Sequence, residues 1–126
     1  MKYFLIFLTF LVIDCQDAED KVTQEVEKKA LEELADEIRA IADESVCSAE
    51  YSCDFIGFGS KPCGGHWSYL VYSNSIDVVE FIARVKAYNI LEEEYNKKWD
   101  VFSDCMAVMP PSATTCENGK CKPVYN

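Results

Sequence analysis

Histidine is nearly absent from this chain, since His66 is the only one among its 126 residues. A metal site built from several histidines is therefore excluded, and a histidine-dependent catalytic triad would need that single ring. No two cysteines stand in a Cys-x-x-Cys pair, so a structural zinc site is not expected. The five glycines fit neither the phosphate-binding loop nor the dinucleotide-binding motif. We therefore predict that the protein uses no metal and no cofactor.

Positive charge is also scarce. The 12 lysines and arginines face 22 aspartates and glutamates, which gives a net charge of −10 and a pI near 4.5. Such a balance repels a phosphate backbone, so no nucleic-acid partner is expected. A basic protein or a divalent cation would be attracted, although acidity also keeps an exported protein soluble. Neighbouring carboxylates such as Glu32 and Glu33 point to different sides of a helix, so they form no converging pair for glycoside hydrolysis.

No apolar run is long enough to cross a bilayer. Residues 3–13, interrupted only by Thr9, make a run of about eleven, which matches the apolar region of a signal peptide and is about half of a transmembrane span. We interpret residues 1–15 as a signal peptide and predict secretion of a chain that begins at Gln16, with no membrane span. The alternative is a lipoprotein anchored at Cys15, but the charged Asp14 before it is unfavourable there.

The cysteines divide into Cys15 and an even set. If Cys15 leaves with the signal peptide, the others can form disulfides in an oxidising compartment. Each bridge would add on the order of 3 kcal/mol to a small domain in the chain-entropy model. The residues expected to pair are Cys47, Cys53, Cys63, Cys105, Cys116 and Cys121. Spacing alone leaves their connectivity open.

Residues 16–46 are predicted to form an acidic amphipathic helix. The segment is rich in Ala, Leu, Glu and Lys and contains no Gly or Pro. Its apolar residues recur at helical spacing and are expected to form one stripe: Val22, Val26, Leu31, Leu34, Ile38 and Ile41. We expect the stripe to pack on the rest of the same chain, with a second copy or a lipid surface as alternatives.

Residues 47–126 are predicted to form one compact, Cys-bridged α+β domain. Within it, residues 53–58 and 67–72 have the composition of strands, and the loop between them is full of turn formers. These two strands are expected to form a hairpin. Residues 101–105 predict a further short strand.

A second helix and a last hairpin complete the expected fold. The helix is predicted at residues 75–99, with Ser75 as its N-cap. The side of the helix that faces the sheet is expected to carry Val78, Ile82, Val85 and Tyr95. A two-residue turn at 118–119 would place Cys116 opposite Cys121. The predicted fold is therefore α+β, with two long helices packed on a small antiparallel, disulfide-stapled β-sheet.

Five short motifs carry a resemblance to a known family. They are Lys-Pro-Cys-Gly-Gly at 61–65, Trp-Ser-Tyr-Leu-Val-Tyr at 67–72, Glu-Tyr-Asn-Lys-Lys-Trp at 94–99, Ser-Asp-Cys at 103–105 and Cys-Glu-Asn-Gly-Lys at 116–120. Together they resemble a family of small exported proteins, secreted or lipid-anchored, of Bacteroidetes-type bacteria, which has no assigned function. The resemblance spans about residues 53–126 and implies export, a cross-linked domain and no catalytic residue. It also implies that Cys47 pairs with Cys121, because these two are less typical of the family than the other four.

Two loops are candidate binding sites. Residues 106–111 are apolar and stiffened by proline, and Pro110 after Met109 would resist cleavage, so this loop could present a preorganised apolar strip. The alternative is that Val108 and Met109 fold back onto the helices. The second loop holds the only histidine close to a cysteine, although an exposed histidine beside a disulfide is the simpler interpretation. The candidate binding residues are Ala107, Val108, Met109 and Pro110, and then Gly64, Gly65, His66 and Trp67.

The predicted function follows from the lack of metal-site, nucleotide-binding and catalytic motifs and from the cross-linked scaffold. We expect a secreted, non-enzymatic binding or inhibitory module that acts on an extracellular protein, and the charge favours a basic one. Two alternatives stay open: a small extracellular hydrolase that uses the loop at residues 63–67, and an acidic matrix or cation-binding protein. The oligomeric state is not predicted.

Overall fold

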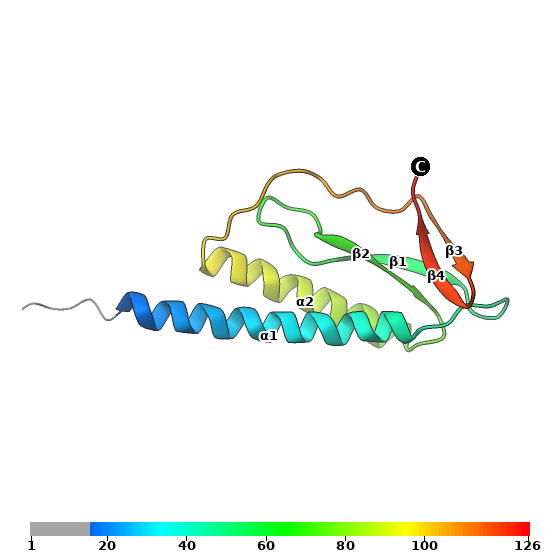
Figure 1. Cartoon of the computed structure of the whole chain (residues 1–126), viewed down its shortest axis with the longest axis horizontal. Helices are drawn as coiled ribbons and strands as arrows, with labels where there is room; N and C mark the ends of the chain where they lie inside the picture. Colours follow the sequence, from blue (N-terminus) through cyan, green and yellow to red (C-terminus); the bar gives the residue numbers. More distant parts are fainter. Residues whose placement is uncertain (1–15) are drawn as a thin grey trace, which may run out of the picture.

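Two long helices and two β-hairpins make up the described part of the chain (Figure 1). The computed structural model describes residues 16–126, so the predicted signal peptide, including Cys15, lies outside the described residues. The element order is α1 (Gln16–Glu44), β1 (Cys53–Phe58), β2 (Ser68–Ser73), α2 (Val78–Lys98), β3 (Ala113–Glu117) and β4 (Lys120–Val124). The helices lie side by side below the first hairpin in Figure 1, and the second hairpin stands at one end. This arrangement confirms the predicted α+β class.

The second half of α1 carries the residues that pack on the domain. Its buried members are Ala35, Ile38 and Ala42. Val22 and Val26 are instead exposed, so the prediction of one continuous stripe is wrong for these two. Because each helical residue turns by about 100°, Val22 lies about 160° around the helix from Ile38. The apolar pattern therefore changes sides between the two halves of α1.

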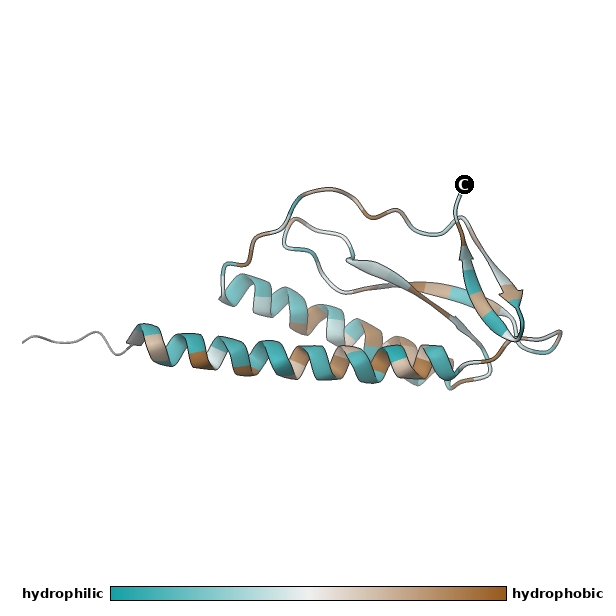
Figure 2. Ribbon diagram, viewed as in Figure 1, coloured by the Kyte–Doolittle hydropathy of each residue, from teal (hydrophilic) through white to brown (hydrophobic). Residues whose placement is uncertain are grey.

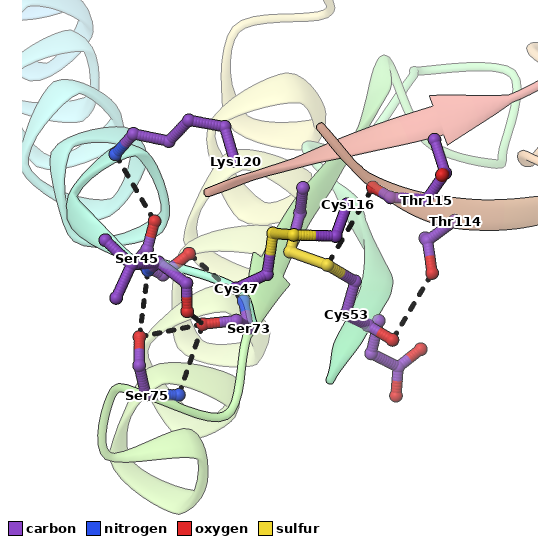
Figure 3. Close-up of a disulfide and its surroundings, with 12 residues drawn as sticks. Ser45, Cys47, Cys53, Ser73, Ser75, Thr114, Thr115, Cys116 and Lys120 are labelled. Carbon is purple, nitrogen blue, oxygen red and sulfur yellow. Dashed lines mark hydrogen bonds between the residues drawn. A yellow bond between two sulfur atoms is a disulfide. The ribbon is translucent and has the colours of Figure 1, made fainter. Parts of the chain in front are cut away.

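The C-terminal end of α1 is tied to the rest of the fold by hydroxyl groups and one lysine (Figure 3). Ser45 Oγ accepts a hydrogen bond of 3.0 Å from the backbone N–H of Ser73, whose own hydroxyl lies 2.7 Å from Ser75 Oγ. Lys120 Nζ donates to the backbone carbonyls of Asp43 and Ser45. The last carbonyls of a helix need such partners, and a cation at this end also complements the helix dipole.

The strands form two separate two-stranded antiparallel sheets. The pairing of β1 with β2 confirms the predicted first hairpin. In the second hairpin Cys116 lies opposite Cys121, as predicted, and the turn uses left-handed φ values of 51° at Asn118 and 77° at Gly119. Residues 101–105 form no strand, so that prediction is wrong. This segment is held by side chains rather than by a backbone ladder.

The N-cap of α2 is Asp77, so the predicted cap at Ser75 is wrong. The Asp77 carboxylate accepts a hydrogen bond of 3.1 Å from the backbone N–H of Glu80, as an N-cap side chain does. The Ser75 hydroxyl is already occupied, because it accepts a bond of 3.0 Å from the backbone N–H of Val46. Ser75 therefore holds the segment after α1, and Asp77 caps α2 in its place.

Aromatic contacts decide which face of α2 is buried. The buried residues are Phe81, Val85 and Tyr88. Val85 was predicted to lie on this face and is buried. Ile82 was also predicted there but is only partly buried, because its neighbour Phe81 points into the core instead. The Phe81 ring packs 4.8 Å from the Tyr72 ring, and Tyr88 stacks on Phe58 at 4.7 Å between centroids. The core therefore lies between the two helices and one face of the first hairpin.

The three disulfides are Cys47–Cys116, Cys53–Cys121 and Cys63–Cys105. The predicted set of cysteines is confirmed, but the pairing of Cys47 with Cys121 is wrong. The sulfurs of Cys47, Cys53 and Cys121 lie within 4.8 Å of one another, so the first two bridges are neighbours (Figure 3). Thr114 Oγ1 donates to the Cys53 carbonyl at 3.3 Å and fixes β1 beside β3. Small differences in the positions of these sulfurs therefore decide which cysteines pair, and the spacing of cysteines in the sequence does not contain that information.

Candidate functional site

A segment without regular structure connects α2 to β3. Residues 101–112, called the strap below, pass over the first hairpin (Figure 1). At its start the backbone N–H of Val101 donates to the Asn96 carbonyl at 3.0 Å, and at its end the N–H of Ser112 donates to the Val124 carbonyl at 2.8 Å. The predicted apolar loop is the second half of this strap.

Lys61 fixes the strap from the side of the hairpin. Its side chain is only 4% exposed, and a buried charge is costly unless it is paired and hydrogen-bonded. Nζ donates to Asp104 Oδ1 at 2.8 Å and to the Met106 carbonyl at 2.7 Å, and it lies 5.0 Å from the centroid of the Trp67 ring. The hydrogen bond from Lys61 lowers the pKa of Asp104, and the backbone N–H of Met106 adds to the effect. Sequence reasoning missed this anchor.

The Cys63–Cys105 bridge joins the same two segments covalently. Cys63 follows Lys61 by two positions, and Cys105 stands between the two strap residues that Lys61 contacts, so the bridge and the ion pair reinforce each other. The two predicted binding loops, at 64–67 and 107–110, therefore leave from one shared anchor. Since Cys63 is disulfide-bonded, it offers no thiolate to His66, and this gives no support to a thiol-dependent hydrolase.

Beyond the anchor the strap presents apolar side chains to solvent. Met106 is 76% exposed, Met109 70% and Val108 40%, so Val108 and Met109 do not fold back onto the helices. Phe102 is also exposed, at 88%. It was not predicted as a binding residue because residues 101–105 were expected to form a strand. Pro111 is buried and holds the far end. Figure 2 shows apolar colour along much of the strap.

The second predicted loop is organised by two glycines and by the packing of His66. Gly64 and Gly65 have φ values of 97° and 80°, which favour glycine. The His66 ring covers Gly57, because a Cβ at that glycine would lie 2.1 Å from the ring Cδ2. Its Nδ1 lies 2.9 Å from the Gly59 carbonyl. His66 is thus half-buried against the hairpin and is no freely exposed loop residue.

Polar side chains of α2 hold the start of the loop that follows β1. Asn89 Oδ1 accepts a hydrogen bond of 2.7 Å from the Gly59 N–H. Glu92 accepts one of 3.0 Å from the Ser60 N–H, and Asn96 donates to the Ser60 carbonyl at 2.8 Å. Residues three and four apart share one helix face, so the three side chains form a row along the loop. They place the loop, and through it Lys61, relative to α2.

A polar cleft of about 510 Å³ opens between this loop and α2. Its walls include Gly64, Gly65 and His66 on one side and Glu93, Lys97 and Asp100 on the other. Lys97 pairs with Glu93 at 2.7 Å, and that carboxylate raises the pKa of Lys97. Every buried polar side chain in residues 16–126 has a hydrogen-bond partner. The cleft therefore offers mixed charge and, among the described residues, no buried polar side chain without a partner.

Comparisons with protein-family models, curated proteins and solved structures find no match to this chain. The family resemblance therefore stays a prediction. Within residues 16–126, neither helix is both long and apolar enough to cross a membrane. The three disulfides are consistent with an oxidising, extracellular compartment.

Proposed function

We propose that the protein is a secreted, non-enzymatic binding module that holds an extracellular partner protein with its strap. The observation that carries the proposal is the combination of exposed apolar side chains at residues 106–110 and of anchors at both ends of this segment. Apolar side chains that gather on one exposed surface mark interaction sites in soluble proteins. Met106, Val108 and Met109 gather in this way within one short segment.

The braced conformation of the strap favours binding because the segment is ordered before a partner arrives. Fixing the backbone of one residue costs about 1–2 kcal/mol, so a flexible loop of this length would lose several kcal/mol of binding free energy. In the free protein the segment is already restrained by Lys61, by the Cys63–Cys105 bridge and by buried Pro111. Part of that ordering cost is therefore absent when the partner binds, because both ends of the segment are already fixed.

Charge and cysteine content favour a basic partner outside the cell. A net charge of −10 attracts a basic protein and speeds its approach. Disulfides persist in oxidising compartments, and the predicted signal peptide would direct the chain there. Secretion of a chain that begins at Gln16, with three disulfides and no lipid at Cys15, is therefore part of the proposal.

The test is capture of a partner by the oxidised chain and by two charge variants. The chain that begins at Gln16 is immobilised, incubated with extracellular fluid, and its bound proteins are identified by mass spectrometry. Val108→Asp puts a charge into the proposed contact, whereas Val79→Asp puts the same charge on exposed α2 surface outside the strap. We expect Val108→Asp to weaken binding of the captured protein at least about tenfold, or about 1.4 kcal/mol, and Val79→Asp to leave it unchanged.

Thermal unfolding of both variants provides the control. Both positions are exposed, so both variants should unfold at the temperature of the wild type. Equal binding by the two variants would show that the captured protein does not touch the strap. Unfolding of Val108→Asp alone would show that the strap supports the core, and the proposal would then lose its basis.

A further inference from the structure

The free backbone of the strap narrows the class of partner. Among residues 16–126, none makes a hydrogen bond to the backbone N–H or C=O groups of residues 107–110. None of these four residues has a positive φ, and the segment contains no turn. It therefore passes as a single stretch without a neighbouring strand (Figure 1). A peptide with free backbone groups and exposed apolar side chains is the form that adds to the edge strand of a cleft.

We infer that the partner is an endopeptidase whose substrate cleft takes the strap, with the Met109 side chain in a large apolar specificity pocket. This inference rests on the proposed function and adds the class of partner. An endopeptidase holds its substrate beside the catalytic groups and selects one side chain in a pocket next to the bond that it cuts. The strap is a braced version of such a substrate.

The contacts of the strap select Met109 over Met106 and Phe102. Met109, at 70%, is also more exposed than Val108, at 40%. The residue in the pocket must leave its carbonyl oxygen free, because that oxygen enters the oxyanion hole. Met106 does not qualify, since its carbonyl accepts the hydrogen bond from Lys61 at 2.7 Å. Phe102 does not qualify either, because the backbone that follows it is held against the hairpin by the Cys63–Cys105 bridge. Met109 is exposed and its carbonyl is free.

Pro110 explains why the strap would be held by the enzyme and not be cut. The leaving nitrogen of the bond after Met109 belongs to proline, which has no N–H and whose ring fixes φ near about −65°. That nitrogen cannot donate the hydrogen bond that an ordinary peptide offers, and the ring limits how the chain fits beyond the pocket. The next residue, Pro111, is buried and restrains the exit side of the strap.

The test exchanges the side chain that enters the pocket. The oxidised chain from Gln16 is assayed against a chymotrypsin-type endopeptidase, which has an apolar pocket, and against a trypsin-type endopeptidase, whose pocket holds an aspartate. We expect the wild type to inhibit only the first enzyme. Met109→Lys should transfer inhibition to the second, with each inhibition constant changing at least about a hundredfold. Met106→Lys is the matched control, because that side chain is equally accessible while its carbonyl is held by Lys61.

A second variant reports on the bond itself. Pro110→Ala restores an ordinary peptide bond after Met109, so the chymotrypsin-type enzyme should cut there and add the mass of one water, while the wild type stays intact under the same conditions. Failure of the wild type to inhibit the first enzyme overturns the inference, and so does transfer of inhibition by Met106→Lys. A captured partner that Val108→Asp releases but that has no peptidase activity would also overturn it and would leave the proposed function standing.

Discussion

The Cys47–Cys116 and Cys53–Cys121 bridges should stabilise the protein redundantly. They close loops of nearly equal length, with sequence separations of 69 and 68. The Cys63–Cys105 bridge already shortens each of these loops to about 28 residues, so in the chain-entropy model either bridge, added to a chain that lacks the other, contributes about 3.5 kcal/mol. Once one is present, the second closes a ring of only about a dozen residues, because Cys47 is close to Cys53 in sequence and Cys116 is close to Cys121. Its contribution then falls to about 3 kcal/mol.

Alanine pairs measure this redundancy. Replacing both cysteines of one bridge should cost about 3 kcal/mol of unfolding free energy, whichever bridge is chosen, because the other still closes the long loop. Replacing all four should cost about 6.5 kcal/mol, which exceeds the sum of the two single losses by about 0.5–1 kcal/mol. The loss is therefore more than additive.

Denaturant titration of the wild type, the two pair variants and the four-alanine variant provides the free energies. The Cys63–Cys105 bridge stays intact in all four proteins and serves as the common background. Each cysteine is truncated to alanine equally in the single and combined variants, so the cavity contributions cancel in the coupling energy. A combined loss equal to the sum of the two single losses would refute the reasoning, because the bridges would then act independently of the shared loop.

Three further measurements address the core, a buried tyrosine and the strap. Phe81→Ala should lower the free energy of unfolding by about 3–5 kcal/mol and Ile82→Ala by much less, since only Phe81 is fully buried; equal losses in denaturant unfolding would contradict the assigned face of α2. Burial, with a smaller effect of a nearby carboxylate, raises the pKa of Tyr88 to about 12. Its contribution to stability is therefore complete below the ordinary tyrosine value of about 10 and is lost as the pH rises above it. An ultraviolet titration step that Tyr88→Phe removes would identify the group. The pKa of Asp104 is lowered by Lys61, so the anchorage of the strap holds above the ordinary aspartate range and is lost as the pH falls through the lowered value. Protection of the Met106 N–H, which donates to Asp104, should fall on acidification when its exchange rate is compared with the intrinsic rate at each pH, and a Lys61→Met variant that retained the same pH dependence would argue against this anchor.

Elements with local causes were predictable from the sequence. The segment that forms α1 lacks helix breakers and has helix-forming residues throughout, and its predicted bounds agree with Gln16–Glu44 within two residues. The turn at Asn118 and Gly119 needs only two residues that tolerate a positive φ, and once it is placed the register follows. In both cases residues close in sequence decide the structure.

Features that depend on distant residues could not be predicted in this way. The buried face of α2 is set by the contact of Phe81 with Tyr72, which a helical pattern alone does not contain. The apolar character of residues 107–110 was visible, but the anchor that makes it a candidate site was not. Lys61 and Asp104 are 43 positions apart, and no motif joins them. Burial of a lysine becomes apparent only when its partners are in place.

The connectivity of the bridges determines what a broken backbone would do to this molecule. A cut in the strap after Cys105 would divide the chain into two pieces, and the second piece would carry Cys116 and Cys121. Both are bonded to cysteines of the first piece, so the pieces would stay joined at two points. The new ends would also stay close, because one remains braced at Lys61 and the other continues directly into β3. A protein cut in the strap would therefore migrate as one species in electrophoresis until its disulfides are reduced. The two new ends could also be rejoined within one molecule, because the pieces do not separate.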